Sequence, residues 1–125
     1  MPRPMTSADF RELVLGMEGV AEGAHMGHAD FRAGGRVFAG LTADETHATL
    51  RLPPDEQATL LASAPAAFEA AAGAWGRQGW TRMDLRTVTR ADARSAVLLA
   101  WEHTMATPAR SRSAKTATPR RSRRS

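Results

Sequence analysis

Apolar residues near the start of the chain recur with the spacing of one helix face. Phe10, Leu13, Val14 and Met17 stand at i, i+3, i+4 and i+7, which predicts a helix over about 6–17. Thr6 precedes this stripe and can cap the helix. Asp9 stands three residues after Thr6, in the capping-box position. The pattern therefore predicts both the helix and the way its first turn is capped.

Two further helices follow later in the chain. Pro53 and Pro54, followed by two acidic residues, suit a helix N-terminus, and this helix should end near Ser63. A broad apolar stripe begins after Thr89 and runs to about residue 106. So wide a stripe predicts a helix that lies across a sheet.

The region between the first two helices has the alternation and turn residues of strands. We expect strands at 21–26, 30–32, 37–41 and 46–52, with Gly34-Gly35 making a tight hairpin turn. A further strand is predicted over 80–86, whereas 66–79 shows no regular pattern. Helices and hairpin-connected strands in separate groups indicate an α+β fold with a mostly antiparallel sheet.

Composition and charge divide the chain of 125 residues into two parts. Residues 1–107 hold ten basic and 13 acidic side chains, a net charge of −3, whereas the whole chain carries +4. We therefore expect one domain over 1–106 and a disordered Arg-rich tail over 107–125. The tail holds seven basic residues that could contact phosphates: Arg110, Arg112, Lys115, Arg120, Arg121, Arg123 and Arg124.

Several functional classes are excluded or disfavoured by residue content. The chain has no cysteine, which excludes disulfides, thiolate metal sites and a Cys nucleophile. No apolar run is long enough to span a membrane and Met1–Phe10 lacks a signal-peptide pattern, so we expect a cytoplasmic protein. The sequence leaves the oligomeric state open and is compatible with a monomer.

Three segments together resemble the MmcQ/YjbR-like family. They are the stretch from His25 to Ala39, the strand-to-helix joint from Leu50 to Gln57, and the segment from Gly73 to Leu85. The resemblance covers about residues 6–106 and none of the tail. It implies a single α-β-β-β-α-β-β-α domain, similar to the frataxin (CyaY-like) or secretion-chaperone layout, with the helices on one face of the sheet. Members of the family are usually described as DNA-binding by structural analogy, so the resemblance implies DNA binding as an expectation for this chain.

The strongest candidate binding residues are tryptophans and arginines around the last strand. Alternation places Trp80 and Arg82 opposite Thr81, Met83 and Leu85, on the sheet face that the helices would leave exposed. The candidates for stacking on bases and pairing with phosphates are Arg51, Trp75, Arg77, Trp80 and Arg82. The alternative is that Trp75 and Trp80 pack on each other and close an edge of the domain.

A second candidate site surrounds the first hairpin. His25, His28 and Asp30 could line a polar groove near Trp80, or the imidazoles could simply bond to nearby backbone. A metal would need a third ligand such as Asp30 or Glu22, and no second histidine pair exists. We expect no metal, no cofactor and no catalytic residue, because phosphate-loop, dinucleotide and nucleophile-elbow motifs are missing.

These observations lead to two hypotheses of function. The first is a non-enzymatic DNA-binding protein that uses the exposed sheet face, with the tail adding non-specific affinity. The second is a small-molecule or protein-interaction module that uses the groove near His25, His28, Asp30 and Trp80. The negative body charge argues against the first.

Overall fold

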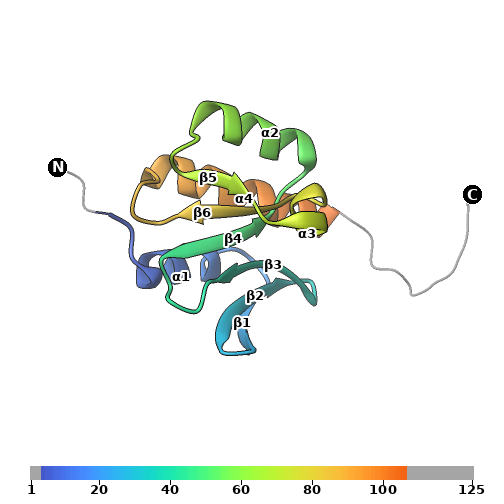
Figure 1. Ribbon diagram of the computed structural model, residues 1–125. Coiled ribbons are helices and arrows are strands. Elements are labelled where there is room, and N and C mark those ends of the chain that lie inside the picture. The colour runs from blue at the N-terminus through green and yellow to red at the C-terminus, as the bar shows by residue number, and fades with distance from the viewer. Residues whose placement is uncertain (1–3, 107–125) are drawn as a thin grey trace, which may run out of the picture.

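The computed structural model describes residues 4–106, apart from the side chain of His25. The elements follow in the order α1 (Ser7–Leu15), β1 (Val20–His25), β2 (His28–Ala33), β3 (Arg36–Leu41), β4 (His47–Arg51), α2 (Pro54–Ser63), β5 (Phe68–Ala70), α3 (Gly73–Arg77), β6 (Trp80–Asp84) and α4 (Arg90–Ala106). The six strands form one sheet in the order β1-β2-β3-β4-β6-β5, and every neighbouring pair is antiparallel (Figure 1).

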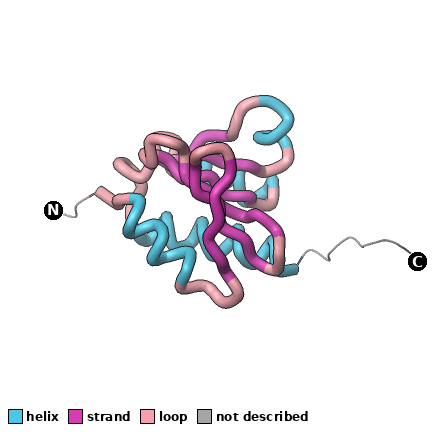
Figure 2. Tube along the Cα trace, turned by 90° about the horizontal axis from the view of Figure 1, so that it is seen from below, coloured by secondary structure: helices cyan, strands magenta, loops and turns pink. Residues whose placement is uncertain are grey.

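The helices α1 and α4 pack on one face of this sheet, and α2 lies beside β5. Figure 2 shows α1 and α4 on one side of the strands. The largest fully buried apolar side chains belong to one core cluster, built from these helices, the strands and the loops beside them: Phe10, Val14, Phe31, Phe38, Leu41, Leu50, Leu52, Met83, Leu85 and Val97. In α4, a stripe of small residues faces the sheet, including Ala93, Ala96 and Ala100. These small side chains let the helix lie close to the strands, as the broad stripe in the sequence predicted.

Local signals in the sequence are confirmed at several element ends. The Thr6 hydroxyl accepts from Asp9 N–H at 3.1 Å and the Asp9 carboxylate accepts from Thr6 N–H at 3.0 Å, a complete capping box for α1. Gly34 and Gly35 take φ values of +60° and +81° in the β2–β3 turn. The Thr89 hydroxyl likewise accepts from Asp92 N–H, at the start of α4.

The α+β class and the alternating groups of helices and strands are confirmed. Four strands precede α2, at the positions that the residue pattern predicted. Residues 66–79, where the pattern predicted no element, form the short strand β5 and the five-residue helix α3. The predicted tail over 107–125 lies outside the described residues. None of the helices within residues 4–106 has the length and apolar character needed to cross a bilayer.

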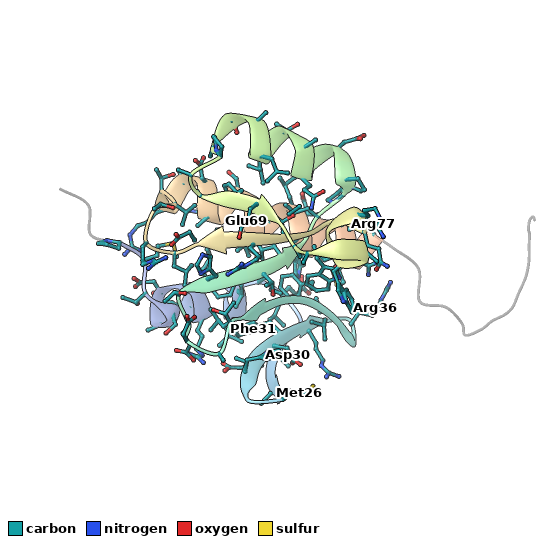
Figure 3. All side chains as sticks on the ribbon, in the orientation of Figure 1. Met26, Asp30, Phe31, Arg36, Glu69 and Arg77 are labelled. Carbon is teal, nitrogen blue, oxygen red and sulfur yellow. The ribbon has the colours of Figure 1, made fainter. Side chains whose placement is uncertain are left out.

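Strand register defines a second face of the sheet, which we call the open face. Across β4 and β6 it pairs His47 with Asp84, Thr49 with Arg82, and Arg51 with Trp80. In β2, Asp30 lies on this face, whereas its neighbour Phe31 is fully buried in the core (Figure 3). The open face therefore carries the polar and charged side chains of the same strands that build the core.

Candidate functional site

A groove of about 560 Å³ lies on the open face, between β2 and α3. Four strands and the segment around α3 contribute its lining: His28, Asp30, Arg32, Val37, Ala39, Gly40, Thr49, Ala71, Trp75 and Trp80. Most of this lining is aliphatic or aromatic, with Asp30, Arg32 and His28 as its ionisable groups. A volume of this size falls in the range of about 300–1,000 Å³ typical of small-molecule sites.

Trp75 and Trp80 form an aromatic corner at one end of the groove. Their ring centroids are 6.3 Å apart and the ring planes meet at 74°, an edge-to-face contact. Trp75 stands on α3 and is 63% exposed, whereas Trp80 on β6 is half-buried. The two indoles thus pack on each other, as one alternative in the sequence analysis held, and they also line a hollow that stays open.

The side chain of Gln57, on α2, stabilises this aromatic corner. Its buried side-chain amide donates to the carbonyl oxygens of Gly76 and Trp80 and to the hydroxyl of Thr81, each at 3.1 Å. These three partners belong to the end of α3 and to β6. One side chain of α2 therefore ties together the two elements that carry the tryptophans.

Asp30 is the buried acid of the groove. Its side chain is only 7% exposed, and the Nε of Arg32 lies 3.5 Å from Oδ1. That oxygen is buried and has no hydrogen bond from the described residues. Asp30 pairs in register with Gly23 on one side and Gly40 on the other.

Gly23 and Gly40, the neighbours of Asp30 in the sheet, each leave space for a different side chain. A Cβ at Gly23 would stand 3.0 Å from Asp30 Oδ1, and one at Gly40 would stand 3.0 Å from the Thr49 hydroxyl. Gly40 also lines the groove. The missing side chain at Gly23 therefore leaves room for the carboxylate itself, and the missing side chain at Gly40 keeps the hollow open beside Thr49.

Charged side chains on β4, on β5 and on or just after β6 form ion pairs with one another. We call this region the ion-paired half of the open face. Arg82 lies 3.0 Å from the Glu69 carboxylate, and Arg86 lies 3.1 Å from Asp84. His47 Nε2 is 3.7 Å from the same Asp84. The guanidinium groups of Arg82 and Arg86 are therefore already neutralised within the chain.

Hydrogen bonds lower the pKa of two acids in and beside this region. The pKa of Asp84 is lowered chiefly by the Arg86 side chain, and then by the Arg86 backbone N–H. The pKa of Asp44, in the β3–β4 turn, falls to about 2, because it accepts from the Thr46 backbone and from two threonine hydroxyls. Both effects stabilise the ionised carboxylates at neutral pH.

Arg51 and Arg77 lie away from the ion pairs. Arg51 is the last residue of β4. The pKa of His103, on α4, is lowered first by burial and then by the positive charge of Arg51. Arg77 ends α3 and is exposed (Figure 3). Neither arginine lines the groove. The five candidate residues for nucleic-acid contact thus divide between the groove (Trp75 and Trp80), an ion pair (Arg82) and two arginines outside both (Arg51 and Arg77).

The structure brings together His28, Asp30, Trp75 and Trp80, all of which the sequence had singled out. It adds residues that sequence reasoning did not select as site residues: Arg32, Val37, Ala39, Gly40, Thr49 and Ala71. Only strand register could have found them, because they come from three strands and a loop. The tail residues lie outside the described part of the chain, as does the side chain of His25. Within residues 4–106, no group of three or more acidic or histidine side chains is placed to hold a metal ion.

Comparisons with known proteins show which family and which solved structure this chain resembles. The YjbR family model matches residues 15–103, and the chain belongs to that family. Among solved structures, the chain is similar to the crystal structure of Deinococcus radiodurans protein DR2400, which carries a DUF419 domain. The TM-score is 0.70 at 17% identity, over 82% of this chain and 80% of that one. No curated protein matches the chain.

Proposed function

We propose that this protein is a non-enzymatic binding protein that takes a small, mainly apolar ligand in the groove of the open face. The observation that carries the proposal is the corner of Trp75 and Trp80 beside a hollow of about 560 Å³. Ligand sites typically combine such apolar walls with a few polar groups that orient the ligand. Asp30, Arg32 and His28 are the polar groups of this groove.

DNA binding is the second proposal. The observation that favours it is that register places Arg51 and Arg82 on the open face, as alternation in the sequence predicted. It ranks below the groove because Arg82 is paired with Glu69 and the chain up to residue 107 carries a net charge of −3. A DNA-binding surface normally offers unpaired cations to the phosphates.

The groove can be tested with the full chain and Nile red, a neutral dye whose emission shifts to the blue in apolar surroundings. Trp75→Ala should weaken dye binding by about fivefold, which corresponds to roughly 1 kcal/mol of aromatic contact. Trp75 is exposed, so the substitution should leave the fold intact. Leu98→Ala is the matched control, because Leu98 is also an exposed apolar residue but lies on α4.

Equal dye binding by the Trp75→Ala and Leu98→Ala variants would refute the groove as the binding site. The same preparations should be tested with duplex DNA at about 50 mM salt, where electrostatic binding is strong. If Arg82→Ala weakens DNA binding and leaves dye binding unchanged, while Trp75→Ala has no effect on the dye, the second proposal replaces the first.

A further inference from the structure

We propose that the ligand of the groove carries an organic cation, such as an alkylated ammonium group, held between the indoles and the Asp30 carboxylate. This inference rests on the proposed function, because it names the chemistry that the same groove would select. It follows from three features: the two tryptophan rings, the state of the carboxylate, and the space around it.

The aromatic corner suits a cation. An ammonium group is attracted to the face of an aromatic ring, and tryptophan is the strongest of the aromatic side chains in this respect. Trp75 and Trp80 meet at 74° with centroids 6.3 Å apart, so their planes form two walls at nearly a right angle. Rings in such an arrangement can contact a tetrahedral alkylammonium group on two sides.

The carboxylate of Asp30 supplies the opposite charge. A buried carboxylate is stable when hydrogen bonds and a cation compensate it. Here the compensation is incomplete, because Oδ1 is buried without a hydrogen bond from the described residues and the Arg32 Nε stands 3.5 Å away. A ligand cation in the groove would complete the compensation.

The two glycines that flank Asp30 in register have different roles. The Asp30 carboxylate itself occupies the space that a side chain at Gly23 would need, whereas Gly40 lines the groove and adds no side chain to it. The groove between Asp30 and Thr49 is therefore left open to a ligand.

An anionic ligand is the opposing possibility, since Arg32 and His28 also line the groove. The cation is favoured because the acid is the buried partner of the Asp30–Arg32 pair. The Arg32 side chain is 51% exposed and water can solvate it, whereas that of Asp30 is 7% exposed. A ligand cation can therefore displace the guanidinium to solvent at little cost, whereas a ligand anion would leave Asp30 buried without its cation.

The test compares three probes of nearly the same shape and different charge: choline, 3,3-dimethylbutan-1-ol and 3,3-dimethylbutanoate. The protein is the full chain with Trp101→Phe, which leaves the two groove indoles as the only tryptophans. Quenching of their fluorescence reports binding. We expect choline to bind about tenfold more tightly than the neutral alcohol, within the range of cation–π contacts, and the anion to bind most weakly.

Two variants assign that preference to the carboxylate. Asp30→Asn should reduce the preference for choline over the alcohol to the share that the cation–π contacts with the two indoles supply. Arg32→Gln, at a half-exposed side chain, should tighten choline binding by removing the competing internal cation. If Asp30→Asn does not fold, the Arg32 variant alone carries the test.

Each outcome decides between the proposals. Equal binding of all three probes, preference for the anion, or weaker choline binding by the Arg32→Gln variant would overturn the cation inference and leave the groove as a ligand site. If none of the three probes binds but Nile red still binds in a Trp75-dependent way, the cation inference also fails on its own. The proposed function itself is refuted only if Trp75→Ala leaves Nile red binding unchanged.

Discussion

The two halves of the open face hold similar residues in different electrostatic states. In the ion-paired half, Arg82 meets Glu69 at 3.0 Å and Arg86 meets Asp84 at 3.1 Å, and at least one partner of each pair is 61% exposed. In the groove, Asp30 is buried beside two tryptophans, and the Arg32 Nε lies 3.5 Å from its carboxylate. The comparison teaches that the number of charged residues does not locate a binding surface, because charges compensated within the chain offer little to a partner.

The largest effect should come from the core side of the strand that carries Asp30. Phe31 is fully buried and contacts Phe10 edge-to-face, with ring centroids 5.7 Å apart. Phe31→Ala should lower the free energy of unfolding by about 3–5 kcal/mol, because it leaves a cavity. Urea unfolding followed by circular dichroism measures this. A loss below that of the exposed Trp75→Ala control would contradict the described core.

A smaller loss is expected where α2 supports the aromatic corner. Gln57→Leu removes the amide that donates to Gly76, Trp80 and Thr81. The carbonyls of Gly76 and Trp80 keep their backbone donors, Gly79 and Ala71 N–H, but the buried hydrogen bonds from Gln57 are lost, at a total cost of about 1–3 kcal/mol. Nile red binding should weaken as well, because α3 and β6 lose their common anchor.

Thr59→Ala is the matched control for that substitution. Its hydroxyl donates to the Asp55 carbonyl on the exposed side of the same helix. It should leave dye binding unchanged. If Gln57→Leu and Thr59→Ala have the same effect on dye binding, Gln57 does not position the corner.

The ion-paired half should respond to acid. Asp84 and Asp44 have folded pKa values below the unfolded value of about 4. Their contribution to stability is therefore fully present above that value and is lost as the pH falls through the folded pKa. Urea unfolding should show stability that declines between about pH 4 and pH 2. Asp84→Asn should flatten part of this decline, and an unchanged profile would contradict the lowered pKa of Asp84.

The smallest effect is expected at Arg82. Its ion pair with Glu69 is well exposed, so Arg82→Ala should change the free energy of unfolding by at most about 1 kcal/mol. Nile red binding should not change, because Arg82 does not line the groove. A clear loss of dye binding in this variant would mean that the two halves of the open face act together.

Much of the fold could be predicted because it depends on local patterns. The capping box of Thr6 and Asp9, the Gly34-Gly35 turn and the alternation through Trp80 and Arg82 each involve residues close in sequence. The segment 66–79 gave no such signal, because alanine and glycine carry little periodicity in hydrophobicity. Consequently the residue pattern did not predict β5 and α3 there, although the family resemblance implied two strands between the last two predicted helices.

The candidate site was predictable only in part. His28, Asp30 and Trp80 were selected as groove residues, but the glycines that flank Asp30 come from neighbouring strands, and their role depends on register. The Arg82–Glu69 pair was also missed, since Glu69 belongs to the unpredicted strand β5. Cross-strand contacts determine which charges are compensated, and one-dimensional patterns do not contain them.

The most direct test of the groove as the binding site is two-dimensional NMR of the three indole N–H groups. Trp101 serves as an internal reference, because its N–H donates to the Glu18 carbonyl at 2.9 Å, on the helix layer. On titration with a ligand that quenches tryptophan fluorescence, the indole signals of Trp75 and Trp80 should shift together while that of Trp101 stays in place. Shifts confined to Trp101, or equal for all three, would contradict a binding site on the open face.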